Sequence, residues 1–345
     1  MSLYSEIMEQ PERVNSLLDV QRAAVERIAA EIKKYDIRYV FLAARGTSDN
    51  AGRYANYLFG AKNHLPLALA TPSLFTYYKK PPILANALVI GVSQSGQSPD
   101  IISVLEEGNK QGSLTIAITN EPDSPLARAS SCVLDIQAGV ETAVAATKTY
   151  TNELMAIAML SCAMNQDEAR WQELTRVAEW MRETFRLNEN ISNIVQRYRY
   201  INHTVVLGRG FNYCTAFEWA LKLKELTYVA AEPYSFADFQ HGPLALVERG
   251  FPVMVVSPQG AVSTSSLEMI GTLKKKFSAE LVVISNDSSA LELANSPIPI
   301  PANIPEWLSP MICIIPAQLF AYHLTVAKGL NTEQPRSIHK VTETD

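Results

Sequence analysis

The sequence predicts two tandem α/β domains, each built around a doubly wound parallel sheet. Short apolar runs of strand length alternate with helix-length segments along the 345 residues, an alternation that gives a parallel sheet with helices on both faces. The pattern also repeats, because Gly46 recurs as Gly210 and Ser93 as Ser257, each 164 residues later and at the end of a similar apolar run. An apolar content of 47% is enough to fill the cores of two such domains.

The expected strands indicate where each domain begins and ends. Strands are predicted in the first domain at 38–44, 87–92, 114–120 and around Leu134, and the last two are echoed at 281–286 and 298–300. The chain then divides into N-terminal helices (1–35), a first sheet domain (36–165), a helical linker (166–200), a second sheet domain (201–330) and a tail (331–345). The apolar stretch 307–322 is interrupted by two prolines and Gln318, so a buried helix is expected there rather than a membrane span.

Charge and cysteine content exclude several classes of partner and compartment. The net charge is −5 and no stripe of Lys and Arg is present, so neither nucleic acid nor an anionic membrane surface is expected as a partner. The four cysteines are scattered without paired spacing, which favours a reducing, cytoplasmic location and gives no zinc site. Early acidic residues at the N-terminus are not typical of a signal peptide.

Two turns of the first domain have the composition of a phosphate site. The first follows the run ending at Val92 and contains Ser93, Gln94, Ser95 and Ser98, and the second follows the run 38–44 and contains Gly46, Thr47 and Ser48. Unpaired amides at a helix N-terminus bind phosphate together with short hydroxyl side chains. For either turn alone, ordinary helix capping explains the composition equally well.

The second domain has a different turn after its corresponding strand and a set of charged residues of its own. Its copy of the first turn, 257–262, contains Pro258 and fewer hydroxyls, so the phosphate is expected in the first domain. Glu218, Lys222 and Glu225 have the spacing of one helix face, and His241 follows in a segment of turn residues. A salt-bridged surface helix and a solvated loop histidine are the alternatives, whereas a general acid for sugar ring opening would also have this appearance.

Six motifs, taken together and in order, resemble a known family. They are Arg45-Gly46-Thr47-Ser48, Ser93-Gln94-Ser95-Gly96, Ala145-Ala146-Thr147-Lys148, Glu218 to Glu225, His241-Gly242-Pro243-Leu244-Ala245-Leu246 and Gln334 to Lys340. This set resembles the isomerase half of glucosamine-6-phosphate synthase, a tandem of two sugar isomerase (SIS) domains with flavodoxin-like sheets. The resemblance implies homodimers that share the active site between subunits, a sugar phosphate as ligand, and no metal or organic cofactor.

The resemblance also implies a role for each matching residue. The phosphate would lie on Ser48, Ser93, Gln94, Ser95 and Ser98, with Gly46 and Thr47 in the same turn and with Val144 and Ala145 near the sugar. Glu225 would move the proton between C1 and C2 with support from Lys222, His241 would open the ring, and Lys340 would form a Schiff base with the open ketose. The tail 331–345 has no helical or strand period, so a frayed end is the alternative to a mobile segment that closes over the substrate.

Departures from the synthase pattern suggest which reaction is catalysed. Gln97, Ala146 and Gln240 replace a glutamate, a serine and a lysine of that pattern, and no glutaminase domain is expected before the first SIS domain. The chain is therefore predicted to be an enzyme most similar to the SIS-type glucosamine-6-phosphate deaminases, which release ammonia and fructose 6-phosphate. A fructosamine 6-phosphate deglycase and a ketose/aldose phosphosugar isomerase are alternatives, and a sensor that binds sugar phosphates without catalysis is an alternative of another class.

Overall fold

The computed structural model describes residues 2–340, so positions 341–345 of the predicted tail lie outside the described residues. The chain folds into two compact units, each with one sheet. The first-sheet unit consists of 9–142, 146–178 and the described residues 339–340, and the second-sheet unit consists of 2–8, 143–145 and 179–338. Each unit therefore combines segments that are distant in the sequence.

The first-sheet unit contains five parallel strands in the order β2-β1-β3-β4-β5. Their bounds are β1 (Tyr39–Ala43), β2 (Leu67–Leu69), β3 (Ala87–Val92), β4 (Leu114–Thr119) and β5 (Cys132–Asp135). β3 and β4 are buried along their whole length, as expected of central strands with helices on both faces. The strand order reverses direction between β1 and β3, and in open α/β sheets ligands bind at the carboxyl ends of the strands beside such a point.

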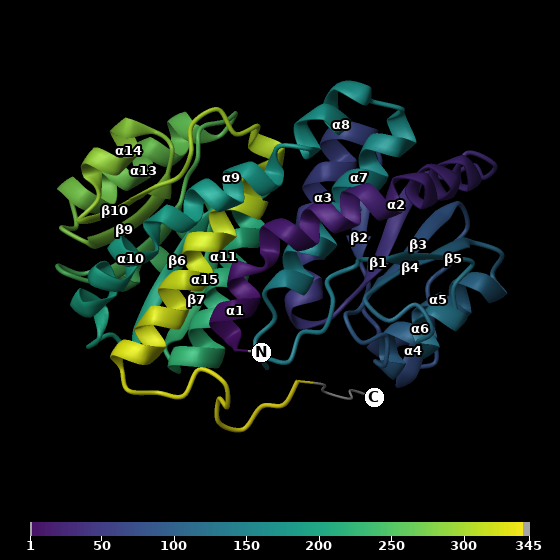
Figure 1. Cartoon of the computed structure of the whole chain (residues 1–345), viewed down its shortest axis with the longest axis horizontal. Helices are drawn as coiled ribbons and strands as arrows, with labels where there is room; N and C mark the ends of the chain where they lie inside the picture. The colour runs from purple at the N-terminus through teal and green to yellow at the C-terminus, as the bar shows by residue number, and fades with distance from the viewer. Residues whose placement is uncertain (1, 341–345) are drawn as a thin grey trace. The chain divides into compact units, whose positions relative to one another are not determined.

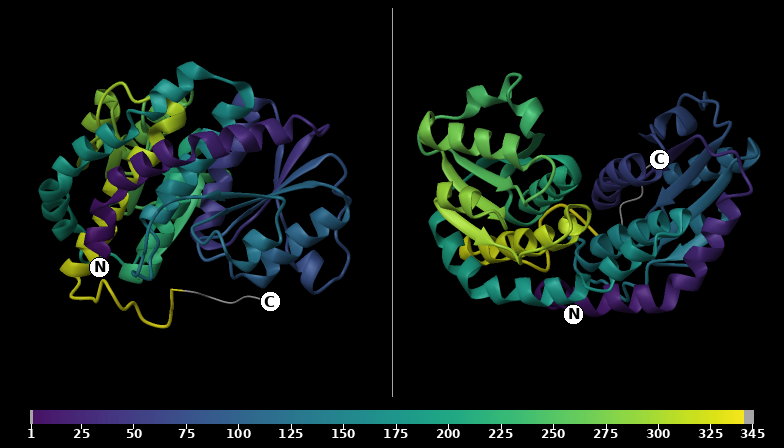
Figure 2. Two further views of the ribbon diagram at one scale, coloured as in Figure 1. Left: turned by 45° about the vertical axis from the view of Figure 1, so that its right-hand side comes forward. Right: turned by 90° about the horizontal axis from the view of Figure 1, so that it is seen from above.

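Helices form two groups around the first sheet (Figures 1 and 2). The first group packs α2 (Gln10–Ile32) and α3 (Gly46–Asn63) against α7 (Lys148–Asn165), and the second packs α4 (Ser73–Thr76) and α6 (Pro125–Arg128) against α5 (Pro99–Lys110). α8 (Glu168–Leu174) continues from α7, and α9 (Val177–Thr184) spans the division at residue 178. One apolar core lies between β3 and α5 and includes Val89, Val104 and Leu105.

The second-sheet unit repeats the same strand order. Its five parallel strands run β7-β6-β8-β9-β10. Their bounds are β6 (His203–Gly208), β7 (Ala230–Ser235), β8 (Pro252–Val256), β9 (Glu280–Ser285) and β10 (Ser296–Pro299). The prediction of two tandem doubly wound parallel sheets is therefore confirmed.

Helices again cover both faces of this second sheet (Figure 1). On one face, α15 (Ser309–Ala327) packs against α1 (Leu3–Met8), α10 (Asn188–Ile194) and α11 (Tyr213–Lys222). On the other face, an apolar core that includes Val253 and Leu281 is covered by α12 (Phe236–Phe239), α13 (Ser263–Lys275) and α14 (Ser288–Leu293). Short helical turns complete the unit: η1 (Phe185–Leu187), η2 (Val195–Tyr198), η3 (Gly210–Asn212), η5 (Pro243–Leu246) and η6 (Glu306–Leu308) are of the 3-10 type, and η4 (Leu223–Thr227) is a π-helical turn.

The apolar stretch expected at 307–322 corresponds to η6 and α15. By length and composition, 306–327 is apolar enough to cross a membrane. In the structure most of α15 is buried by neighbouring elements of its own unit, and its apolar residues lie on all sides of the helix axis. A helix that is hydrophobic all round is typical of the core of a large domain as well as of a membrane span.

Candidate active site

The hydroxyl-rich turn 93–98 connects β3 to α5. Ser98 is the N-cap residue of α5 and Pro99 is its first residue, a position where the missing N–H of proline costs nothing. Gly96 has a φ of +60°, and a Cβ at this position would lie 2.1 Å from Ser124 Oγ, so only glycine fits. The Gly96 amide donates to Ser93 Oγ at 3.2 Å, which holds the turn closed around the start of the helix.

The second predicted turn connects β1 to α3 and lies beside the first. Gly46 has a φ of +53°, and the Arg45 side chain donates through Nε to the buried Asp100 of α5 at 2.7 Å. This ion pair joins the two turns. Ser48 is buried and donates its hydroxyl to Glu153 Oε1 at 2.7 Å, so in this structure it bonds to an internal carboxylate.

A pocket of about 350 Å³ opens beside the 93–98 turn. Three of the residues predicted from sequence line it, namely Gln94, Ser95 and Lys340. The remaining lining residues are Gln97, Glu121, Asp123 and Ser124. The first-sheet unit thus brings part of the predicted phosphate turn and the predicted Schiff-base lysine to one cavity, although they are separated by more than 200 positions in the chain.

Glu141 anchors Lys340 in this unit. Lys340 Nζ lies 2.6 Å from Glu141 Oε2, and the carboxylate, whose side chain is fully buried, also accepts from the amides of Thr147 and Thr149 at 2.9 and 3.2 Å. Burial, the strongest influence, raises the pKa of Glu141, but the Lys340 charge and the hydrogen bonds from Lys340, Thr147 and Thr149 outweigh it and leave the pKa below its ordinary value. Glu141 is therefore held as a carboxylate inside the protein.

The carboxylates and lysine predicted on one helix face meet in the second-sheet unit. Lys222 Nζ lies 3.2 Å from Glu218 Oε1 and 2.6 Å from Glu225 Oε2. The α-helix ends at Lys222 and Glu225 lies in the π-helical turn, a rare conformation that is frequent at functional sites. Burial lowers the pKa of Lys222, but the charges of Glu218 and Glu225 and their hydrogen bonds outweigh it and raise the pKa above its ordinary value.

These three side chains differ in their exposure to solvent. Lys222 and Glu218 are almost completely buried, with exposed fractions of 1% and 0%, whereas Glu225 is 22% exposed. Glu225 is therefore the member of the cluster that a ligand can reach, and Lys222 is placed to fix its carboxylate from behind. Lys224, in the same π-helical turn as Glu225, is exposed.

The tail forms neither helix nor strand over 331–340, but it makes specific contacts. In the second-sheet unit the Arg336 amide donates to the Tyr228 hydroxyl at 2.8 Å, and the Arg336 guanidinium lies 4.0 Å from the centre of the Tyr228 ring. Such a cation over an aromatic face is attractive. Since Tyr228 directly follows the π-helical turn with Glu225, the tail is held next to that element.

The remaining predicted residues do not line the pocket. His241 is exposed in the turn after α12, where its amide donates to the Asp238 carbonyl at 3.0 Å. Val144 is half-buried and Ala145 is buried in the loop before α7, and both belong to the second-sheet unit. Thr47 is half-buried in the first turn of α3.

Sequence reasoning missed two residues that the structure places at these sites. Glu141 was not selected, although it is a carboxylate in an otherwise uncharged stretch from 136 to 147 that leads into the Thr147-Lys148 motif. Tyr228 was not selected either, and its partner lies 108 positions away, so local spacing contains no signal for the pair.

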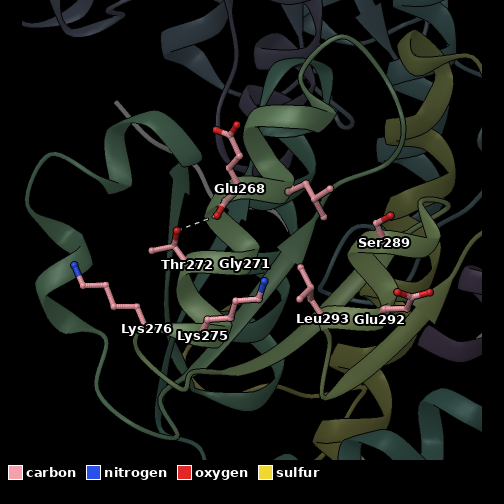
Figure 3. Close-up of a pocket in the computed structure, with 9 residues that line it drawn as sticks. Glu268, Gly271, Thr272, Lys275, Lys276, Ser289, Glu292 and Leu293 are labelled. Atoms are coloured by element: carbon pink, nitrogen blue, oxygen red, sulfur yellow. Dashed lines mark hydrogen bonds between the residues drawn. The ribbon is translucent and has the colours of Figure 1, made fainter.

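A second pocket, of about 700 Å³, lies on the α13 and α14 surface (Figure 3). It contains none of the residues predicted from sequence. Its lining combines apolar side chains with scattered charges, and the Thr272 hydroxyl in it donates to the backbone carbonyl of Glu268 at 2.9 Å. The described lining of this larger pocket contains neither a hydroxyl-rich glycine turn nor a cluster of candidate catalytic side chains, in contrast to the pocket beside Ser95.

The described residues include four cysteines and no cluster of side chains placed to hold a metal ion. Over 2–340, no group of three or more His, Cys, Asp and Glu side chains is placed to hold a metal ion. All four cysteines are free thiols, and burial raises the pKa of Cys162 to about 12, which makes its thiol a poor nucleophile.

The sheets and the turns at their carboxyl ends agree with the comparison to known sequences. The sequence pattern of the SIS domain matches twice, over residues 35–163 and 198–328, so that each match contains one of the sheets. The chain belongs to the SIS domain family. The family membership expected from the six motifs is thereby confirmed.

Relatives of this tandem SIS chain include an enzyme of aminosugar synthesis. Glutamine–fructose-6-phosphate aminotransferase (isomerizing) of Legionella pneumophila is 34% identical over 339 residues, which cover 95% of this chain and 54% of the relative. The solved C-terminal domain of glucosamine-fructose-6-phosphate aminotransferase from Francisella tularensis is 29% identical, with a TM-score of 0.87 and coverage of 96% of this chain and 98% of that domain. The SIS chain spans about half the length of the curated relatives it matches.

A more distant SIS structure has the same fold. Glucosamine-6-phosphate deaminase from Thermotoga maritima is 21% identical, with a TM-score of 0.74 and coverage of 98% of this chain and all of that one. At this identity the likeness concerns the fold alone.

Proposed function

We propose that this SIS chain is a phosphosugar isomerase that converts glucosamine 6-phosphate and water to fructose 6-phosphate and ammonia. The observation that carries the proposal is the pocket in which Lys340 faces the same cavity as Gln94 and Ser95. A sugar phosphate that forms an imine needs both an anion-binding turn and an amine nucleophile. The carboxylates of Glu121 and Asp123 in the same lining suit the ammonium group of an aminosugar.

The family supports the class of reaction. The relatives are isomerizing aminotransferases that act on fructose 6-phosphate by their names, and the matched part of the Francisella enzyme is its C-terminal domain. The deaminase from Thermotoga shares the fold and adds a precedent for the degradative direction.

The proposed steps use this chain's own residues. His241 protonates the ring oxygen to open the sugar, and Glu225 then removes the proton from C2 and returns it to C1. Lys340 attacks C2 of the resulting iminium, ammonia leaves, and water hydrolyses the new Schiff base to free fructose 6-phosphate and Lys340. Atoms balance with one water consumed and one ammonia released.

Two buried charges position these groups. Lys222, between Glu218 and Glu225, lies 2.6 Å from Glu225 Oε2 and so holds this carboxylate in one position. Glu141 holds the Lys340 ammonium at 2.6 Å and thereby fixes the tail beside the pocket. We assign both as positioning residues, since neither role requires contact with the substrate.

The proposal includes a homodimer that shares its active site. His241 is exposed on its own chain, so its ring is available to a substrate held by a second copy. Mixing a His241→Ala chain with a Glu225→Gln chain tests this point, because hybrid dimers with one complete site recover activity only if the two residues come from different chains.

A panel of substrates tests the reaction. The protein is incubated with glucosamine 6-phosphate, N-acetylglucosamine 6-phosphate, fructoselysine 6-phosphate and galactosamine 6-phosphate, and released ammonia or amine is measured. Ammonia from glucosamine 6-phosphate alone is the expected result. Release of lysine would favour the deglycase, interconversion of plain ketose and aldose phosphates would favour the simple isomerase, and binding without turnover would favour a sensor.

A single variant links the measured activity to this site. Glu225→Gln keeps the size of the side chain but removes the base, so turnover is expected to fall by at least about a hundredfold with ligand binding little changed. Lys224→Gln, an exposed neighbour in the same turn, is the matched control and is expected to leave turnover unchanged. Full activity of Glu225→Gln would show that this carboxylate is only structural.

A further inference from the structure

The second-sheet unit contains a counterpart of each turn of the phosphate site. Gly210 follows β6 as Gly46 follows β1, and the two have φ values of +62° and +53°. Each preceding arginine bonds to the helix that follows the other turn: Arg45 to Asp100 at 2.7 Å, and Arg209 to Ser265 at 3.0 Å. The two pairs of turns therefore have the same local architecture.

In the second-sheet unit this place is filled by a carboxylate. Glu306 Oε2 accepts from the Ala261 amide at 2.9 Å, just before the first residue of α13. The carboxylate also covers Gly260, where a Cβ would lie 2.2 Å from Glu306 Cδ. A Cβ on Gly210, in the other turn, would lie 3.7 Å from Glu306 Oε1. One carboxylate thus bonds to the 257–262 turn and lies near Gly210 of the other turn.

The first-sheet unit differs at the corresponding place. There the amides of Gly96 and Gln97 are both met by serine hydroxyls of the turn itself, Ser93 Oγ and Ser95 Oγ, at 3.2 and 3.4 Å. In the second-sheet turn the Gly260 amide also meets a serine hydroxyl, at 2.7 Å, and the next amide meets the Glu306 carboxylate instead. Hydroxyls can turn their donor towards an incoming anion, whereas a carboxylate offers only acceptors and repels it. The turn of the second-sheet unit therefore has a negative charge beside its amides, whereas the turn of the first-sheet unit has neutral hydroxyls there.

We propose that the Glu306 carboxylate occupies a phosphate-sized anion site of the second-sheet unit, so that this unit supplies its own anion and binds none from solution. The site it fills would otherwise take inorganic phosphate or the phosphate group of a sugar phosphate. The backbone amides at the start of a helix and the dipole of α13 favour a negative group here, whichever molecule provides it.

Counting bound phosphate on the full chain tests the proposal. Equilibrium dialysis with inorganic phosphate compares the wild type with Glu306→Ala and with Glu292→Ala. Glu292→Ala is the matched control, because it removes the same charge from an exposed position of α14 in the same unit. Glu306→Ala is expected to bind one more phosphate per chain than either of the others. This difference does not depend on whether the first-sheet unit binds sugar phosphates. The experiment can therefore overturn the Glu306 proposal without bearing on the proposed function.

Hydrogen exchange locates the additional phosphate. In Glu306→Ala, phosphate is expected to slow exchange in the peptide covering 257–265 at least severalfold, and chloride at equal ionic strength is expected to have no such effect. If the alanine variant does not fold, Glu306→Gln keeps the side-chain volume and permits the same measurement. Equal phosphate binding by a folded Glu306 variant and the wild type, or phosphate protection of 257–265 in the wild type, would overturn the proposal.

Discussion

Lys340 Nζ and Glu141 Oε2 lie 2.6 Å apart and form the contact that fixes the end of the described chain beside the hydroxyl-rich turn 93–98. Glu141 is completely buried and receives further hydrogen bonds from the residues that begin α7. The imine proposed for Lys340 therefore requires that a substrate displace this ion pair. Four predictions concern this ion pair, the two copies of the hydroxyl-rich turn, and His241.

The first prediction concerns covalent trapping by Lys340. Borohydride treatment in the presence of fructose 6-phosphate is expected to attach the sugar phosphate to the peptide containing Lys340, because reduction makes a Schiff base permanent. Lys340→Met is expected to abolish the adduct while both sheets stay folded, which mass spectrometry and circular dichroism measure. An adduct on Lys340→Met would assign the imine to another lysine, and no adduct on the wild type would favour isomerisation by Glu225 without an imine.

The second prediction concerns the pH dependence of the Glu141 interactions. Because the folded pKa of Glu141 lies below that of an exposed glutamate, about 4.3, its carboxylate stabilises the folded state above the unfolded pKa, and this contribution is lost as the pH falls through the folded pKa. Hydrogen exchange of the peptide covering 141–150, corrected for intrinsic rates, is expected to show protection at pH 7 that declines in acid.

Glu141→Gln supplies the reference for that measurement. It is expected to remove the acid-dependent part of the protection and to weaken tail docking by roughly tenfold or more, since a hydrogen bond to a charged group is worth about 1.5–3 kcal/mol. Glu121→Gln, which changes a carboxylate of the same pocket, is the control and is expected to keep the wild-type pH profile. Identical profiles for wild type and Glu141→Gln would contradict the anchoring role.

The third prediction compares the two copies of the hydroxyl-rich turn. Ser95→Ala is expected to weaken sugar-phosphate affinity by about tenfold to a hundredfold, through loss of a charge-assisted hydrogen bond. Ser257→Ala changes the first residue of the corresponding turn in the second-sheet unit and is expected to leave affinity unchanged. Calorimetric titration with glucosamine 6-phosphate measures both, and equal losses would place the phosphate elsewhere.

The fold was predictable because its signals are local. Buried central strands such as β3 and β4 are continuous apolar runs, and the spacing of the repeat identified the corresponding strands in the second half of the chain. The edge strands β2 and β7 were not predicted, because the first has only three residues and the second is interrupted by Pro233. A proline is tolerated there because an edge strand has one side without a ladder partner.

The site was predictable only in part. Motif spacing selected Ser95, Lys222 and Glu225, whose neighbours are close in sequence. It did not select Glu141, because the contact with Lys340 spans 199 positions and depends on the tail returning to the first-sheet unit. It also gave no sign that Ser48 bonds to Glu153, 105 positions away. Contacts between residues so distant in sequence depend on how the chain is connected through the fold, and this cannot be read from a single sequence.

The fourth prediction separates ring opening from proton transfer. His241→Asn is expected to lower turnover of cyclic glucosamine 6-phosphate strongly, because the ring oxygen then lacks its proton donor, and to spare an acyclic substrate analogue. Steady-state rates on the two substrates measure the difference. Equal losses on both would show that His241 acts at another step, and equal activity on both would remove it from the mechanism.

Among the described residues that line the pocket beside Ser95, Lys340 supplies the ammonium group, whereas the others lie between 94 and 124. During synthesis the ribosome therefore completes both sheets before it adds Lys340, the proposed nucleophile. On the proposed mechanism, a nascent or proteolysed chain that stops short of this position would retain the 93–98 turn, lose the proposed nucleophile and bind sugar phosphate without turnover. Cleavage just before Lys340 would, on the proposed mechanism, separate binding from catalysis without removing a strand of either sheet.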